Sequence, residues 1–180
     1  MSDLSAFTPE EKDLLIGVFF RTGKWISHVD DTGDYASDAE EEEKLIARLG
    51  RLERDINDPG VIAGIGTEAA RRRGDWQNWS ANSQYVLNDV RRAGELIAMR
   101  LGGDHLEAFR TGLMQIATEV AKAYREENNT GPDAKADTIV GHAGKFFTGM
   151  VERFVTKDLN VSDKEAEALE MLSITLKNIE

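Results

Sequence analysis

The chain has 180 residues, of which 41% are hydrophobic, and it carries a net charge of -11. A chain of this length is expected to form a single domain, residues 1–180, that buries about two-thirds of its unfolded surface. It contains no cysteine, which excludes disulfides, thiolate metal sites, thiol catalysis and iron–sulfur clusters. The acidic charge argues against general nucleic-acid binding, because phosphate groups repel an acidic protein.

The sequence shows neither a signal peptide nor a membrane-spanning segment. The first residues show no basic segment followed by an apolar one, so they do not look like a signal peptide. The longest apolar runs, such as residues 14–20, are far too short to span a bilayer. We therefore expect a cytoplasmic protein without membrane insertion, and the composition leaves its oligomeric state open.

The first predicted helix begins after Thr8. This residue suits an N-cap, proline at position 9 suits the first turn, and Glu11 completes a capping box. The helix is predicted to run to about His28. Its apolar residues recur at helical spacing and are Leu14, Leu15, Val18, Phe19, Trp25, Ile26 and Val29.

A second capping box begins at Ser37 and predicts a helix to about Asn57. The acidic run Glu40–Glu43 lies in its first turns, where it is favourable with the helix dipole and needs no function. One buried stripe is expected at the spacing i, i+4, i+7, i+11, formed by Leu45, Leu49, Leu52 and Ile56.

Asp58 and Pro59 predict the start of a short helix that ends with Gly74 as its C-cap. Its inward side chains are predicted to be Val61, Ile62, Ile65 and Ala69. Residues 75–80 look like a short turn or helical start. The two tryptophans there, at positions 76 and 79, are expected to pack at the core edge or against a neighbour and not to stack on bases.

Four further helices are expected. The first spans residues 82–101 and is stopped by Gly102 and Gly103, and the second begins with Asp104 as cap and is predicted to be the central core helix. The third covers about 133–157, and the fourth is capped by a box at Ser162. Because no segment alternates like a strand, we predict an all-α bundle of about seven helices. The inward residues are expected to be Val86, Val90, Ala93 and Ile97; Leu106, Phe109, Leu113, Ile116, Val120 and Tyr124; Ala143, Phe147, Met150 and Phe154; and Leu169, Leu172, Leu176 and Ile179.

The acidic loop between the first two helices is a candidate cation site. The oxygen-bearing positions of an EF-hand would fall on Asp30, Thr32, Asp34, Asp38 and Glu41. The sixth position, however, is Tyr35, where the sharp turn needs glycine, so a true EF-hand is not expected. A looser Ca²⁺ or Mg²⁺ site remains open, with Asp30, Asp31, Asp34, Glu40 and Glu41 as the predicted ligands. The alternative is a solvated acidic loop that binds no metal.

His28 stands beside this loop, and a histidine with carboxylates suits zinc. The other two histidines, His105 and His142, fall on different predicted helices, so no zinc-ligand spacing is present. The simpler interpretation is a surface histidine at a helix C-terminus. Known enzyme motifs for phosphate, hydrolase or metalloprotease chemistry are absent from the sequence. We therefore do not expect an enzyme, although glutamates on several helices leave a carboxylate site open as a third hypothesis.

Two windows of the chain resemble the TerB-like tellurite-resistance family. The first is Thr8-Pro9-Glu10-Glu11 followed by an apolar helix, an Asp-rich loop and a Glu-rich helix start. The second is Leu113-Met114-Gln115-Ile116-Ala117-Thr118-Glu119-Val120-Ala121-Lys122-Ala123, a loop, and Val161-Ser162-Asp163-Lys164-Glu165-Ala166-Glu167-Ala168-Leu169. Each window places an apolar helix, a loop and a Ser-Asp-x-Glu helix start in the same order, so the two ends of the chain echo each other.

The resemblance implies a compact helical bundle of two similar halves with a role in stress response. It also implies that acidic loop residues bind a divalent cation, namely Asp30, Asp31 and Glu40 in the first half, and Glu127 and Glu165 in the second. The sequence departs from the family pattern in one place, because Thr32 separates Asp31 from Gly33 where the family has Asp-Gly.

The middle of the chain suggests a rival function. Residues 61–103 hold six arginines against four acidic residues, although the whole chain is acidic. The five that form pairs or triplets are Arg71, Arg72, Arg73, Arg91 and Arg92. They predict a metal-free protein–protein interaction module that holds an acidic partner, and the alternative is a solvated helix face in which arginine suits the helix C-terminus.

Overall fold

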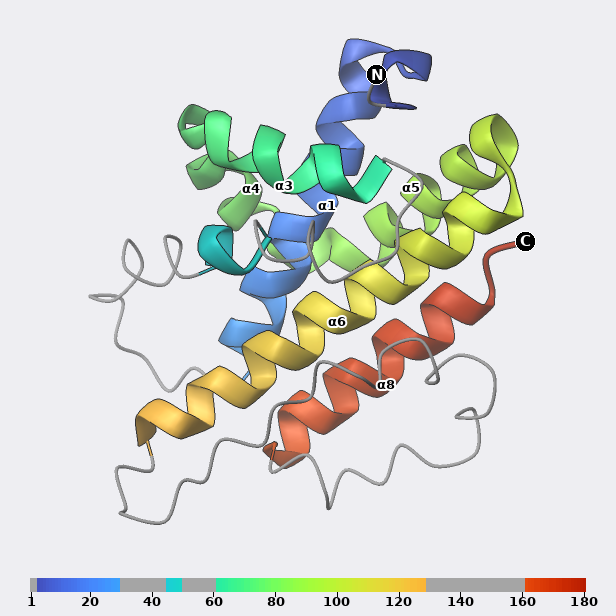
Figure 1. Ribbon diagram of the computed structural model, residues 1–180. Helices are drawn as coiled ribbons and strands as arrows, with labels where there is room; N and C mark the ends of the chain where they lie inside the picture. The colour runs from blue at the N-terminus through green and yellow to red at the C-terminus, as the bar shows by residue number, and fades with distance from the viewer. Residues whose placement is uncertain (1–2, 30–44, 50–60, 129–160) are drawn as a thin grey trace.

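Helix α1 (Pro9–His28) lies at the centre of the fold in the computed structural model, which describes residues 3–29, 45–49, 61–128 and 161–180 (Figure 1). The predicted capping box at its start is confirmed. The Thr8 hydroxyl accepts the backbone N–H of Glu11, and the Glu11 carboxylate accepts the N–H of Thr8 at 2.8 Å. Because two backbone donors are satisfied reciprocally, the entry into α1 is fixed by local sequence alone.

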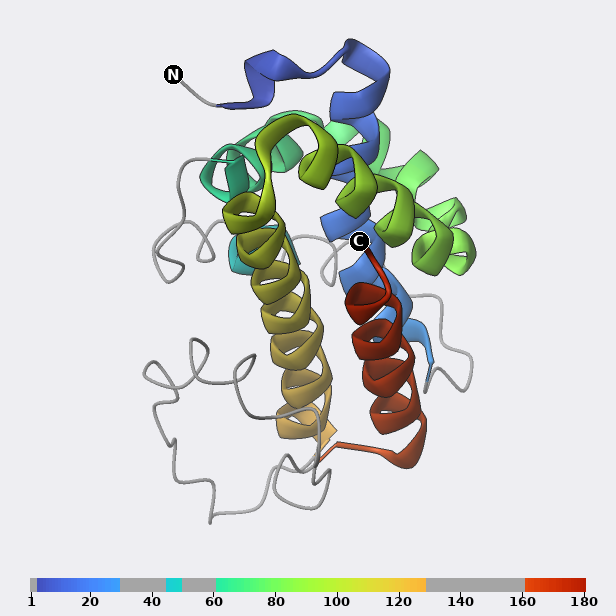
Figure 2. The ribbon, with the colours of Figure 1, turned by 90° about the vertical axis from the view of Figure 1, so that its right-hand side faces the viewer.

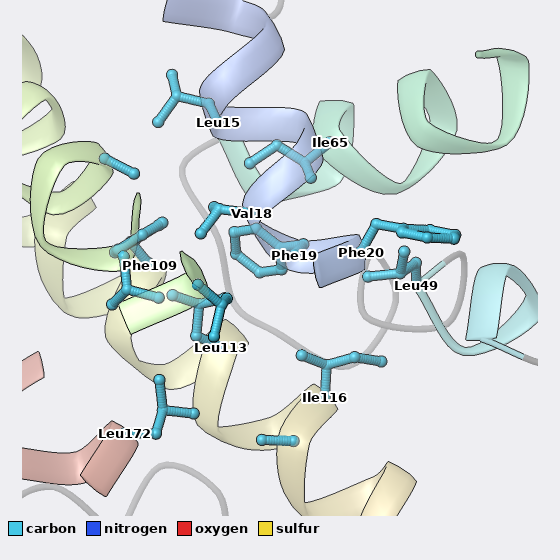
Figure 3. Packing of buried hydrophobic residues seen from close by; sticks show 14 of the residues in the cluster. Leu15, Val18, Phe19, Phe20, Leu49, Ile65, Phe109, Leu113, Ile116 and Leu172 are labelled. Carbon is cyan, nitrogen blue, oxygen red and sulfur yellow. The ribbon is translucent and has the colours of Figure 1, made fainter. Parts of the chain in front are cut away.

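Almost every residue of α1 from Leu15 to Ser27 is buried. Figure 3 shows Phe19 of α1 directed toward Leu113 and Phe109 of helix α6 (Gly103–Asn128), and its ring meets the Phe109 ring edge-on at 5.6 Å. The prediction that the helix after Gly103 would be the central one is therefore wrong. Apolar side chains surround α1 from Leu15 to Phe20, and a helix that is apolar all round is enclosed by its neighbours.

The chain then forms α3 (Val61–Arg71), the 3-10 turn η3 (Arg73–Asp75), α4 (Trp76–Ala81), the 3-10 turn η4 (Ser83–Tyr85) and α5 (Val86–Leu101). The predicted C-cap role of Gly74 is wrong: the turn runs through it into α4, and Gly74 has no positive φ angle. Both tryptophans of α4 are buried, so they lie in the core itself, where the prediction had placed them at its edge or against a neighbour. The predicted inward residues of α5 are also buried, namely Val86, Val90, Ala93 and Ile97.

Helix α5 ends at Leu101 and is capped by Gly102, whose φ of 89° and ψ of -175° suit glycine only. This confirms the predicted stop. The next helix, α6, begins at Gly103 and runs to Asn128. Asp104 therefore lies within the first turn of α6 and is not its cap, because the chain becomes helical again directly after Gly102. The predicted core stripe of α6 is confirmed for the described side chains, which are Leu106, Phe109, Leu113, Ile116 and Val120.

Helix α8 (Asp163–Lys177) lies antiparallel beside α6 (Figures 1 and 2). Its predicted capping box is present, with Ser162 and Glu165 exchanging hydrogen bonds. Its C-terminal end is held by α6, where the guanidinium of Arg110 donates to the carbonyl of Leu176 at 3.0 Å and to that of Ile179 at 2.6 Å. These carbonyls would otherwise lack partners at a helix end.

The remaining predicted elements fall wholly or partly outside the described residues. Residues 45–49 are helical, and Leu45 and Leu49 are buried as predicted. The rest of the predicted helix at 37–57, the helix at about 133–157 and the cap at Asp58 lie outside the described ranges. Within those ranges all regular structure is helical and no strand occurs, which confirms an all-α bundle. No helix there combines the length and apolar composition needed to cross a bilayer.

The junction between α5 and α6 yields a stability prediction. Replacing Gly102 by alanine forces an L side chain into a conformation that only glycine adopts easily, so Gly102→Ala should lower the free energy of unfolding by about 1–3 kcal/mol. The measurement is urea unfolding followed by circular dichroism.

Gly103→Ala is the matched control. No atom lies within 4 Å of a Cβ built at either glycine, so space does not distinguish them, and only Gly102 has a positive φ. Gly103→Ala should be neutral or stabilise by up to about 1 kcal/mol. Equal stability of the two variants would contradict the assigned backbone at Gly102.

Candidate functional site

The five predicted metal ligands, Asp30, Asp31, Asp34, Glu40 and Glu41, lie outside the described residues, so cation binding by the first loop stays a prediction. The two residues carried over for the second half have different outcomes. The side chain of Glu127 is also outside the described set. Glu165 is buried, and its carboxylate accepts the backbone N–H of Ser162 at 2.8 Å. Across the described ranges, no three His, Asp or Glu side chains gather closely enough to hold a metal ion.

His28 ends α1 and is partly buried, with its Nε2 enclosed and without a hydrogen-bond partner in the described part of the chain. The acidic loop that follows His28 in the sequence lies outside the described residues. His105 belongs to α6, far along the chain from the end of α1. The zinc hypothesis at His28 therefore also stays a prediction.

The predicted partner-binding arginines have unequal environments. Arg71 is exposed and pairs with Glu68 in the preceding turn of α3 at 2.8 Å. Arg91 and Arg92 are exposed on α5. Arg72 is largely covered by neighbouring groups, with 28% of its side chain exposed. The arginines predicted as one set thus divide into exposed cations and one structural cation, Arg72.

A stack of aromatic rings lies beneath this region. The Phe20 ring of α1 lies 5.8 Å from Trp76 and 5.6 Å from Trp79, measured between ring centroids. The guanidinium of Arg73 lies 5.0 Å from the centre of the Trp76 ring, and that of Arg72 lies 5.2 Å from the centre of the Trp79 ring. Both distances suit cation–π attraction. The two arginines therefore cover the outer side of a buried aromatic cluster.

Three arginines and three aspartates then alternate from η3 across α1 to α5, and we call this series the charge ladder. Its residues in order are Asp75, Arg72, Asp13, Arg21, Asp89 and Arg92; four of the steps are ion pairs, and Asp13 acts on Arg21 through its charge. Arg72 joins two acids, since its Nε donates to Asp75 at 2.6 Å and its Nη2 donates to Asp13. Partial burial alone would lower the pKa of Arg72, but Asp75 and Asp13 together outweigh that effect and raise this pKa.

Arg21 is the buried centre of the charge ladder, with only 6% of its side chain exposed. Its Nε lies 3.1 Å from a carboxylate oxygen of Asp89, and the other oxygen of Asp89 lies 3.7 Å from Arg92. Burial lowers the pKa of Arg21, and the negative charges of Asp89 and Asp13 partly offset this. A charge in this position is tolerated because it is paired.

Gly17 makes room for this arrangement. A Cβ at this position would lie 2.5 Å from Nη1 of Arg21 and 2.9 Å from Nε1 of Trp79. These two side chains therefore converge on α1 where glycine leaves the helix surface open. Sequence reasoning missed Arg21, Asp13 and Asp89. The available signal was a charged residue, Arg21, placed directly after the apolar run 14–20 in the middle of a helix.

The chemistry of the site is that of recognition. Guanidinium groups stay charged, cannot act as bases at neutral pH and bind planar carboxylates through paired N–H donors. The aspartates of the charge ladder are each paired with an arginine, so the outward-directed charge comes from exposed arginines: Arg71, which pairs with Glu68, Arg91, and Arg92, the outer end of the ladder. The arrangement is suited to holding an anionic group on exposed arginines that a rigid part of the fold supports.

A double-mutant cycle tests whether Arg21 and Asp89 depend on each other. Arg21→Met leaves the largely buried carboxylate of Asp89 with the exposed Arg92, at 3.7 Å, as its remaining ion-pair partner and should destabilise the protein by about 3 kcal/mol. The double variant Arg21→Met with Asp89→Leu removes both charges and should be more stable than Arg21→Met alone. Urea unfolding measures all four proteins, and strictly additive effects would contradict the coupling.

The prediction that the first loop binds a cation can be tested by fluorescence, although the loop itself lies outside the described residues. Trp25 lies in the last turns of α1 and is partly buried, so binding in the next segment should change its fluorescence. We expect saturable changes with Ca²⁺ or Mg²⁺, and their loss in Asp31→Asn with Asp34→Asn. Trp25→Phe is the control that separates this signal from Trp76 and Trp79. A wild-type protein that responds to none of Ca²⁺, Mg²⁺, Mn²⁺ and Zn²⁺ would exclude the site.

Comparison with known proteins adds no relative. No family model matches the chain, and neither a curated protein nor a solved structure matches it. The resemblance to the TerB-like family therefore stays a prediction carried by the two sequence windows.

Proposed function

We propose that the chain is a TerB-like helical protein of the stress response that acts by binding and not by catalysis. In this proposal it holds an acidic segment of a partner protein on its arginine surface, defined as Arg71, Arg73, Arg91 and Arg92. The observation that carries the proposal is the exposure of these four cations in an acidic chain, with Arg92 at the outer end of the charge ladder. Cation binding by the first loop belongs to the same TerB-like proposal and has the separate test given above.

The kind of anion follows from the surroundings of the arginines. A nucleic acid would have to approach a protein of net charge -11, which repels a long phosphate chain. Trp76 and Trp79 are 6% and 1% exposed, so their rings offer no open face on which bases could stack. Separate carboxylates on a protein surface need only local positive charge, which exposed arginines supply through two parallel hydrogen bonds each.

The rigid support beneath the arginine surface favours this role. Arg72 is fixed by Asp13, Asp75 and the Trp79 ring, and the Trp76 Nε1–H donates to the buried carbonyl of Ala69 at 2.8 Å. The backbone that carries Arg71 and Arg73 on either side of Arg72 is therefore ordered before a partner arrives. Preorganisation lowers the entropy that binding must overcome.

The TerB-like part of the proposal rests on local structure at the two windows. The capping boxes at Thr8 and Ser162, which carry much of the resemblance, are both formed and each begins a long helix. Such boxes also occur in unrelated helices, so their support is for the helical layout. A stress-response role then predicts that loss of the gene lowers growth under tellurite, and unchanged growth would contradict it.

Arginine neutralisation tests the binding surface. The triple variant Arg71→Gln, Arg91→Gln and Arg92→Gln removes three exposed charges and leaves Arg72 and Arg21 in place. We expect it to retain the wild-type thermal midpoint within about 2–4 °C, because exposed ion pairs contribute little stability. It should lose at least 90% of the partner that co-purifies with the tagged wild type, or of a bound acidic peptide.

The matched control removes three positive charges elsewhere, as Lys122→Gln, Lys164→Gln and Lys177→Gln on α6 and α8. It gives the same change in net charge, so it should retain binding if the arginine surface is specific. Equal losses in the two triple variants would reduce the effect to net charge and contradict the proposed surface.

A further inference from the structure

The cations of the arginine surface have unequal neighbours. Arg71 and Arg92 are each paired with an acidic residue of their own helix, and Arg73 lies over the ring of Trp76. The side chain of Arg91 makes neither a hydrogen bond nor an ion pair in the part of the chain that the structure describes. A carboxylate that arrives from a partner therefore meets a competing acid at Arg71 and at Arg92 but not at Arg91.

The pair of Glu68 with Arg71 is the closer of the two. Nη1 of Arg71 donates to Oε1 of Glu68 at 2.8 Å, and both residues belong to the C-terminal end of α3 (Figure 1). Side chains three residues apart on a helix are neighbours, so the helix itself keeps the acid beside the cation. The side chain of Arg71 is 73% exposed and that of Glu68 is 35% exposed. The pair therefore lies where a partner can reach it.

The pair of Asp89 with Arg92 is of another kind. Its two charged groups are 3.7 Å apart, which is too long for a hydrogen bond. The side chain of Asp89 is only 17% exposed, and its other carboxylate oxygen lies 3.1 Å from Nε of Arg21. Because the buried Arg21 holds this carboxylate, Asp89 competes only weakly for Arg92. Arg71 is therefore the position at which an internal acid competes most directly with a partner.

We propose that Glu68 inhibits the arginine surface from within, because it occupies Arg71 in place of a partner carboxylate and the partner must displace it. This inference rests on the proposed function and adds its regulation. The contact itself shows that Arg71 binds a carboxylate at hydrogen-bonding distance. Exchange of one exposed carboxylate for another is accessible, because each exposed ion pair is weak.

The competition gives the surface a preference among acidic partners. At Arg91 a partner carboxylate gains a complete new ion pair, but at Arg71 it gains only the difference between its own contact and that of Glu68. Two carboxylates in one partner can still displace Glu68, because binding of the first raises the effective concentration of the second. The surface therefore selects dense acidic segments over isolated carboxylates.

Removal of the Glu68 charge tests the competition. The probe is a fluorescein-labelled peptide of alternating glutamate and serine, and fluorescence anisotropy at a fixed salt concentration measures its affinity. The Glu68→Gln variant should bind this peptide about two- to fivefold more tightly than wild type, which is the range that an exposed ion pair supplies. Its thermal midpoint should stay within about 2–4 °C of the wild-type value.

Matched variants separate competition at Arg71 from a change in net charge. Glu107 pairs with Arg110 three residues further along α6, so Glu107→Gln removes the same charge and an ion pair of the same spacing. Arg110 holds the end of α8 and is not part of the arginine surface, so this variant should bind the peptide as wild type does. In the background Arg71→Gln, Glu68→Gln should also have no effect, because the cation for which Glu68 competes is then absent.

Chemical modification measures the contact without a partner. Phenylglyoxal reacts with guanidinium groups, and mass spectrometry of the digested protein gives a rate for each arginine. Arg71 should react more slowly than Arg91 in wild type, since Glu68 covers one of its nitrogens. Glu68→Gln should raise the rate at Arg71 and leave the rate at Arg91 unchanged. An unchanged rate at Arg71 would overturn the inference.

The outcomes separate this inference from the proposed function. Suppose that the acidic peptide binds in an arginine-dependent way, but Glu68→Gln does not tighten binding or tightens it equally without Arg71. Glu68 is then no competitor, and the proposed function stands. If neither wild type nor Glu68→Gln binds the peptide, the proposed function fails and the inference that rests on it fails as well, even where the rate of modification at Arg71 changes as expected.

Discussion

The enclosure of α1 on every side is the constraint on which the rest of the structure depends. A helix buried all round has no face for its polar residues, yet α1 carries Arg21, Thr22 and Lys24 inside the bundle. The buried hydroxyl of Thr22 has a hydrogen-bond partner within the helix, since it donates to the carbonyl of Val18 at 2.8 Å. Arg21 cannot do this, because a buried guanidinium needs a counter-charge. The position of α5, which supplies Asp89, is therefore tied to the charge chemistry of α1.

This constraint extends outward from Arg21. Its guanidinium and the Trp79 indole meet above Gly17, so α4 must approach α1 at that point. Trp79 in turn lies under Arg72, and Arg72 returns to α1 through Asp13. The contacts form a closed circuit that begins and ends on α1. The exposed arginines that we assign to partner binding are the outer edge of a structure whose interior is fixed by the same residue type.

Local patterns predicted most of the helices but not their arrangement. The boxes at Thr8 and Ser162 and the apolar stripes of α5 and α6 depend on residues three or four apart, so one sequence suffices to recognise them. The prediction of a helix C-cap at Gly74 was wrong because glycine permits a helix to end without requiring it. The ion pair of Arg21 with Asp89 joins residues far apart in the chain, and no local rule selects that partner. The arginine surface was likewise predicted only as a set of positions, since the role of Arg72 depends on Asp13.

The position of α1 also has a consequence for synthesis of the protein. The helix that is most completely covered among the described residues is made before the helices that cover it. Its main partners follow much later, since α6 begins at Gly103 and α8 at Asp163. Until they appear, the apolar surface of α1 from Leu15 to Phe20 has only part of its cover, and such surface is prone to aggregate or to be held by chaperones. Protection of this one helix while the remaining chain is made is therefore a requirement that its position in the fold places on synthesis.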